Sequence, residues 1–116
     1  MSVELHRRAE ALMGRAELLE RTDPDESRRL YLEAAALEAD VFAGIPTGRP
    51  KTRGIIAVSA VSLYWRAGAQ DEVARLAREY LACPDIPDFA RYQLGELLAD
   101  RDPARPTACV ADDTDT

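Results

Sequence analysis

The chain contains few of the residues that form disulfide bridges, bind metals or carry out acid–base catalysis. Its 116 residues include two cysteines, Cys83 and Cys109, and one histidine, His6. These residues show neither the spacing of a disulfide framework nor that of zinc ligands. Glycine-rich phosphate loops and nucleophile motifs are missing as well. We therefore expect no metal, no other cofactor and no enzymatic activity, and we expect the reducing setting of the cytoplasm.

Positive charge and long apolar runs are also scarce. The chain has 21 acidic and 15 basic residues, a formal net charge of −6, whereas a nucleic-acid partner requires a basic face that neutralises phosphates. The apolar run at residues 55–65 is shorter than the roughly 20 residues that a bilayer span needs. Residues 1–21 carry charge throughout and lack the apolar segment of a secretory signal. The sequence thus disfavours nucleic acid and membranes as partners and predicts a soluble protein.

Helix signals fill the first 100 residues, while the alternating pattern of strands is missing. Apolar residues recur at helical spacing, and Asp23-Pro24, Gly44 and Gly68 separate the periodic segments. Because the turns are short, neighbouring helices should be antiparallel. The sequence predicts one all-α domain of about five antiparallel helices over residues 1–100, followed by a flexible acidic tail over residues 101–116. We expect helices over residues 2–21, 24–43, 53–67 (with Thr52 as its cap), about 71–82 and 88–99.

The helix predicted at residues 53–67 is apolar on nearly every side. A helix of this kind must be covered from several directions, so the other helices should flank it. About seven of its larger side chains, if fully buried, would contribute roughly 10–20 kcal/mol before the loss of entropy is subtracted. We therefore expect this helix to be the centre of the fold.

The ionisable residues of the first two helices read as surface positions. His6 lies on the charged first helix and is expected to face solvent. Glu33, Glu38 and Asp40 read as the solvated side of the second helix. No histidine–carboxylate pair is therefore predicted.

Residues 67–87, AGAQDEVARLAREYLACPDIP, comprise a tight turn, a helix and a closing proline. The two helix pairs resemble each other: residues of similar type occupy the same turn and packing positions in both. The matching residues are Tyr64, Gly68, Val73, Ala77 and Tyr80 in the second pair and Asp23, Ser27, Tyr31 and Ala34 in the first. This pattern resembles the tetratricopeptide repeat (TPR), and the resemblance covers residues 5–98. It implies two stacked helix hairpins and a C-terminal capping helix; a plain five-helix bundle is the alternative.

The resemblance also implies a partner-binding surface, because TPR proteins place ligand-facing residues on the first helix of each pair. Tryptophan and arginine often carry interface energy, so Trp65 and Arg66 are of particular interest. A tryptophan on an apolar helix can equally belong to the core, and both assignments of Trp65 remain open. The implied partner-binding residues are Ile55, Val58, Ser62, Trp65 and Arg66, together with Leu12 and Ala16.

Arg49, Lys51 and Arg53 form a basic cluster within five residues, on the loop that leads into the N-terminus of the third helix. Three cations near the free N–H groups of a helix N-terminus could hold a phosphate or the carboxylates of an acidic partner. The alternative is that they pair with acidic residues of the second helix or remain solvated.

Taken together, these features predict a non-enzymatic protein–protein interaction module, a small TPR-like adaptor that binds a peptide or helix of another protein. A homo-oligomeric subunit that pairs through its apolar helix face is an alternative. An anion-binding or nucleic-acid accessory protein is a weaker one, because of the net charge.

Overall fold

The computed structural model of the chain describes residues 2–100, which form five helices and no strand. This architecture confirms the all-α prediction. The predicted tail, residues 101–116, lies outside the described residues. The helices are α1 (Val3–Leu19), α2 (Pro24–Ala43), α3 (Pro50–Arg66), α4 (Gln70–Leu81) and α5 (Asp88–Ala99).

Local capping explains the starts of α1 and α2 and the end of α3. The Ser2 hydroxyl accepts a hydrogen bond from the Leu5 amide at 3.2 Å, and the Asp23 carboxylate accepts one from the Glu26 amide at 3.2 Å. Gly68, which follows α3, has φ of 75°, a left-handed conformation that glycine adopts without steric cost. The predicted bounds of α2 and α5 are confirmed.

The predicted start of α3 is wrong. The helix begins at Pro50, with Arg49 as its N-cap residue, and not after Thr52. Proline suits the first helical position because its φ is already helical and because the N–H group it lacks would have had no partner there.

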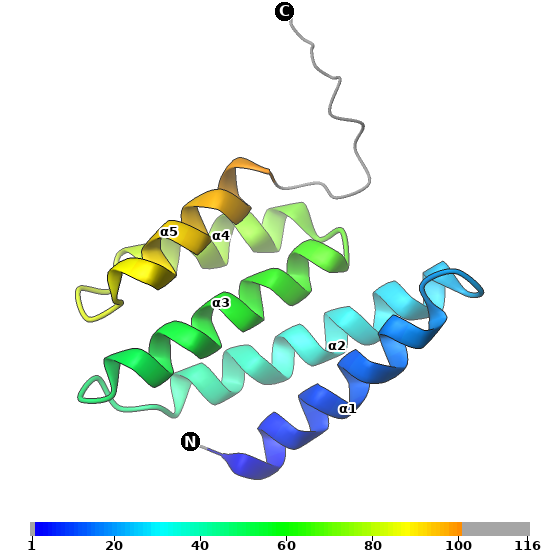
Figure 1. Cartoon of the computed structure of the whole chain (residues 1–116), viewed down its shortest axis with the longest axis horizontal. Coiled ribbons are helices and arrows are strands. Elements are labelled where there is room, and N and C mark those ends of the chain that lie inside the picture. The colour runs from blue at the N-terminus through cyan, green and yellow to red at the C-terminus, as the bar shows by residue number, and fades with distance from the viewer. Residues whose placement is uncertain (1, 101–116) are drawn as a thin grey trace, which may run out of the picture.

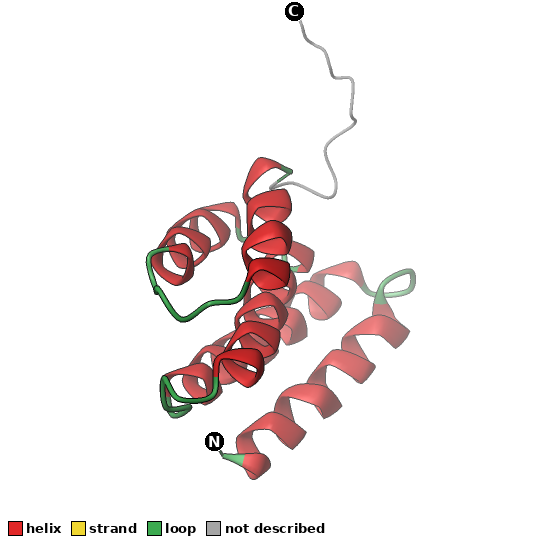
Figure 2. Ribbon diagram, turned by 60° about the vertical axis from the view of Figure 1, so that its left-hand side comes forward, coloured by secondary structure: helices red, strands yellow, loops and turns green. Residues whose placement is uncertain are grey.

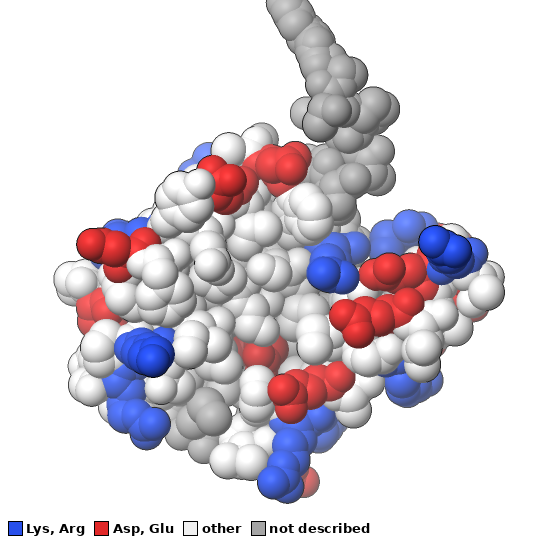
Figure 3. All heavy atoms as spheres, viewed as in Figure 1, with Lys and Arg blue, Asp and Glu red and all other residues white. Residues whose placement is uncertain are grey.

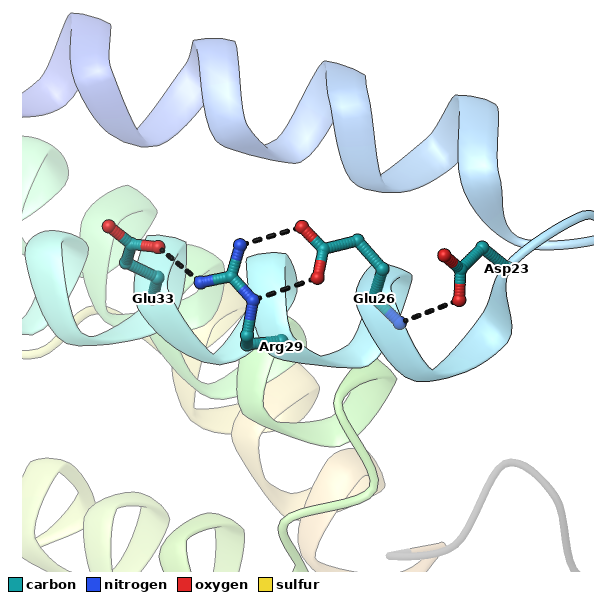
Figure 4. A network of polar contacts seen from close by, with 4 residues as sticks. All are labelled: Asp23, Glu26, Arg29 and Glu33. Carbon is teal, nitrogen blue, oxygen red and sulfur yellow. Dashed lines mark hydrogen bonds and ion pairs between the residues drawn. The ribbon is translucent and has the colours of Figure 1, made fainter.

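On the exposed side of α2, charged residues at helical spacing pair with one another, as Figure 4 shows. The Arg29 guanidinium donates to Glu26 at 2.9 Å and 2.6 Å and to Glu33 at 3.4 Å. Glu33 is therefore on the solvated side of the helix, as predicted. Exposed pairs of this kind add little to stability.

The helices form a thin stack in which consecutive helices run in opposite directions (Figures 1 and 2). Helix α2 packs on α1 and on α3, and α3 also packs on α4 and α5. In Figure 1, α1, α3 and α5 lie toward the viewer, while α4 lies behind α3 and α5. Helix α3 therefore lies at the centre and contacts three of the other helices extensively.

Burial of α3 is extensive but not complete. Ile56, Val61 and Leu63 are buried, and each contributes about 1.5–3 kcal/mol through the apolar surface it removes from water. Ala57 and Ala60 have no exposed surface, and such small residues let helices approach closely. The expectation that α3 is covered on nearly every side is wrong on one side, because Ile55 remains 49% exposed.

Candidate functional site

Two hollows lie on the face formed by α1, α3 and α5, one on each side of α3. The α3–α5 groove has a volume of about 330 Å³, and the Glu38 hollow, between α1 and α3 and over α2, has a volume of about 60 Å³. Figure 3 shows mostly uncharged residues over the middle of α3 and α5, charged residues near the ends of these helices, and an acidic residue recessed between α1 and α3. The groove is lined by Val58, Ser62, Tyr92, Gln93, Glu96 and Leu97, and the hollow by His6, Ala9, Glu10, Met13, Glu38, Ser59 and Leu63.

The structure brings three of the predicted partner-binding residues together. Ile55, Val58 and Ser62 follow one another at spacings of three and four along α3, which places them on one side of the helix. Val58 and Ser62 are half-buried in the wall of the groove, and Ile55 is exposed one turn before them. This stripe of α3 is therefore accessible to a partner.

Trp65 and Arg66 lie at the end of this stripe. The Trp65 ring is half-buried against the core, and its Nε1–H donates to the backbone carbonyl of Asp100 at the end of α5. Arg66 is exposed; its guanidinium lies over the Tyr31 ring, 5.7 Å from the ring centre, and 3.5 Å from Glu20. Trp65 therefore has both a core contact and an accessible edge.

The two predicted residues of α1 lie apart from the α3 stripe. Leu12 is half-buried against the core, and Ala16 has no exposed surface. The Ala16 carbonyl accepts a hydrogen bond from the Ser27 hydroxyl at 2.7 Å, which joins α1 to α2. Ala16 therefore holds two helices together and cannot touch a partner without movement of α1.

Helix α5 supplies groove residues that the sequence did not single out. Tyr92 is 70% exposed and lines the groove. Phe89, which the helical pattern would assign to the apolar core side of α5, is 42% exposed and precedes Gln93 and Glu96 by one and two turns, which places it on their side of the helix. The sequence held one signal for both residues: Phe89 and Tyr92 are aromatic and three residues apart, which places them on one side of α5.

The prediction for Glu38 is wrong, because its carboxylate is buried. The side chain is 2% exposed and lies within 2.8 Å of His6 Nδ1 and 2.9 Å of the Ser59 hydroxyl, which donates to it. The second imidazole nitrogen, Nε2, lies 3.4 Å from the carboxylate of Glu10. The sequence did hold a signal, since Glu38 falls between Ala34 and Phe42 on the buried stripe of α2.

The prediction that His6 faces solvent without a carboxylate partner is wrong as well. Its side chain is 28% exposed and lies between two carboxylates, those of Glu38 and Glu10. The hydrogen bond with Glu38 is the main cause that raises the pKa of His6 above its usual value, the negative charges of Glu38 and Glu10 add to this, and burial opposes it.

Serine, histidine and glutamate side chains meet here, but not in the order that activates a nucleophile. In a catalytic triad the imidazole lies between the hydroxyl and the carboxylate, whereas here the carboxylate lies between the other two. Ser59 is also in the middle of α3, where backbone N–H groups are used within the helix and cannot form an oxyanion hole. Among residues 2–100, no three His, Cys, Asp or Glu side chains are placed to hold a metal ion.

The basic cluster is divided by burial. Arg53 is 8% exposed, and its guanidinium donates to the Asp85 carboxylate and, at 2.8 Å, to the Ile45 carbonyl. It also lies 4.3 Å from the centre of the Phe42 ring. Arg49 and Lys51 are exposed. Only these two are placed to meet an external anion.

Comparison with known proteins adds no relative to this description. The chain matches no protein-family model, no curated protein and no solved structure. Within residues 2–100, no helix has the length and apolar character of a membrane span. The resemblance to the TPR therefore depends on the residues quoted above.

Proposed function

We propose that the chain is a non-enzymatic protein–protein interaction module, a small TPR-like adaptor that binds a peptide or helix of another protein in the α3–α5 groove. In this proposal α1 with α2 and α3 with α4 are the two repeats, and α5 is the capping helix. The order of two antiparallel hairpins and a final helix supports this assignment.

The exposure of apolar side chains around the groove carries the proposal. Six large hydrophobic residues of the described chain are exposed, and Ile55, Phe89 and Tyr92 are three of them. They lie on two adjacent helices that flank one groove, whereas isolated exposed hydrophobics are scattered over most proteins. Tyrosine is also among the residues that contribute most to binding energy. A partner that covers this groove would remove all three from water.

Polar groups along the groove suit a peptide. The Ser62 hydroxyl, the Gln93 amide and the Glu96 carboxylate line the same walls as Val58 and Leu97. A binding site of this composition combines an apolar floor with a few donors and acceptors that orient the ligand. An amphipathic helix or an extended peptide offers the matching mixture of groups.

Pairing with a second copy is the alternative use of the same surface. An isologous dimer through α3 and α5 would bury the same three hydrophobic side chains. An anion-binding role is weaker, because Arg53 already pairs with Asp85 inside the chain.

The proposal predicts that peptide ligands require the groove. We would select binders from a displayed library of random peptides against the intact protein, and then measure their affinity for Ile55→Glu and Tyr92→Glu. Each substitution replaces an exposed apolar side chain beside the groove with a charge, so the apolar contact with the peptide is lost and affinity should fall about tenfold or more.

Leu32→Glu is the matched control, because Leu32 is 44% exposed but lies on α2, away from the groove. The selected peptides should bind this variant as tightly as they bind the wild type. Peptides that bind all variants equally would refute the groove as the site. Light scattering of the same proteins tests the alternative: a dimer that Tyr92→Glu dissociates would assign the face to self-association.

A further inference from the structure

Helix α1 buries smaller apolar side chains than the other long helices. Its two buried side chains are Ala9 and Ala16, and alanine removes little apolar surface from water. Its larger apolar residues, Leu5 and Leu12 among them, are only half-buried. Extensive packing joins α1 to α2 alone. Polar contacts therefore add to an attachment in which no large apolar side chain of α1 is fully buried.

Those polar contacts are divided between the two ends of α1. Near its C-terminus, the Ala16 carbonyl accepts from Ser27, and Glu20 accepts a hydrogen bond from the Tyr31 hydroxyl. Within the described residues, the contact of His6 with Glu38 is the one side-chain hydrogen bond that joins the N-terminal half of α1 to another helix. Because Glu38 also accepts from Ser59, this one carboxylate links α1, α2 and α3.

We propose that His6 is a pH-dependent tie that holds the N-terminal half of α1 against α2 and α3, and that loss of its proton frees this half of α1 to move away from Glu38. This proposal does not depend on the proposed partner groove.

The groups around His6 make the contact sensitive to its charge. The charged groups that face it are Glu10 on α1 and Glu38 on α2, and the polar group from α3 is the uncharged Ser59 hydroxyl. An imidazolium can donate from both nitrogens, one to each carboxylate, whereas a neutral imidazole has a single N–H group. Deprotonation thus removes a charge-assisted hydrogen bond and leaves the buried Glu38 carboxylate without its cation.

The Glu38 hollow gives the carboxylate a route to solvent when the tie weakens. Its volume of about 60 Å³ exceeds the roughly 10–15 Å³ that one water molecule needs. Outward movement of α1 would widen this hollow, so water could replace His6 as the partner of Glu38. The cost of opening is therefore limited.

The direction of the pH effect follows from the raised pKa of His6. Detached from Glu38, the imidazole should titrate near its ordinary value of about 6.5. The stabilisation that the tie supplies is fully present below that value and is lost as pH rises through the higher pKa of the closed form. Helix α1 should therefore open more readily at neutral than at mildly acidic pH.

The test uses the intact protein and two NMR measurements from about pH 5.5 to about 7.5, the range in which histidine changes its charge. Titration of the single imidazole gives the His6 pKa in the folded and in the urea-unfolded chain. Amide hydrogen exchange, corrected for intrinsic rates, gives protection factors for the N-terminal half of α1 and for α3. With rising pH, the protection factors of α1 should fall while those of α3 stay constant. The fall can reach at most tenfold for each unit by which the His6 pKa differs between the closed form and the form detached from Glu38.

Three variants assign the effect. His6→Gln keeps an amide donor but cannot titrate, so its α1 protection should not vary with pH. Glu38→Gln should lower the His6 pKa toward the unfolded value. Glu17→Gln, an exposed position of α1, is the matched control and should behave as the wild type.

Constant α1 protection in the wild type, or an unchanged pH dependence in His6→Gln, would refute the tie. An equal fall in α1 and α3 would also overturn it, because His6 would then act on the stability of the whole fold.

Discussion

Gly54 is a position where α3 lies very close to the start of α5 and to the proline before it. A Cβ atom at this residue would lie 2.9 Å from two ring carbons of Pro87 and 3.2 Å from the Cβ atom of Ala90. Real Cβ atoms are rarely so close to other carbons, and the proline ring cannot move aside without its backbone. Glycine here allows α3 and α5 to form the two walls of the groove.

At the scale of the residue, we predict that Gly54→Ala destabilises the fold by about 1–3 kcal/mol, as overpacking of a buried contact does. Urea denaturation would show the loss as a lower midpoint. Gly95→Ala is the control, because no atom would lie within 4 Å of its Cβ. Alanine in that exposed helix position should stabilise the fold by about 0.5–1 kcal/mol. Equal effects of the two changes would contradict the close approach at Gly54.

Burial also gives residues of one type different roles. Arg53 donates to Asp85 and to a backbone carbonyl inside the chain, while Arg49, four residues earlier, is exposed. Glu33 pairs with Arg29 on the surface, while Glu38, five residues later, is buried beneath His6 and Ser59. The role of each charged side chain is set by what packs over it.

At the scale of the element, α4 depends on α5 for its C-terminal end. The last carbonyl groups of a helix have no partner within it. Here the Arg91 guanidinium, from α5, donates to the carbonyls of Leu81, Cys83 and Ile86 at 2.8 Å, 2.7 Å and 3.0 Å. One side chain thus closes α4 and orders the connector between the two helices.

We predict that Arg91→Leu costs about 2–3 kcal/mol in unfolding free energy, because three carbonyls lose a charged donor. Hydrogen exchange should localise the effect to the last turn of α4 and the connector. Arg78→Leu, at an exposed position of the same turn, should cost less than about 1 kcal/mol, the usual size of a charge–dipole effect. A similar loss in both variants would show that Arg91 acts only through its charge.

At the scale of the whole molecule, the described chain is a slab of 44 × 33 × 19 Å. Since one helix with its side chains is about 10–12 Å across, the slab is about two helices thick. Its interior is a narrow layer between the two layers of helices. Three tyrosines, Tyr31, Tyr64 and Tyr80, are buried in that layer.

This burial predicts that the fold loses stability in alkali. Burial is the main cause that raises the pKa of all three phenols above the ordinary value of about 10. An acid whose folded pKa is raised stabilises the fold below its unfolded pKa, and this stabilisation is lost as pH rises above about 10. In a Tyr92→Phe variant, which lacks the exposed fourth tyrosine, tyrosinate absorbance should therefore appear together with loss of helical circular dichroism. Ionisation of these phenols well before unfolding would contradict their burial.

The helices themselves were largely predictable, because the signals that delimit them are local. Asp23-Pro24 at the start of α2, Gly44 at its end and Gly68 after α3 act on neighbouring backbone groups alone. The predicted start of α3, at residue 53 after a Thr52 cap, is wrong because Pro50 suits the first turn of a helix. Ile55, Val58 and Ser62 were implied as partner-facing by the resemblance to the TPR and not by the spacing of apolar residues, which predicted that α3 is covered on nearly every side.

Only the tertiary structure decided which charged residues of different elements meet. His6 and Glu38 are 32 residues apart, as are Arg53 and Asp85, and the members of each pair lie on different elements. Apolar periodicity, read from the sequence alone, indicates which side of a helix faces the core, and this was enough for the all-α fold. It does not indicate which other helix covers that side, because the pairing of helices depends on packing that no single segment contains. The buried carboxylate and the residues of α5 that complete the groove arose from that packing.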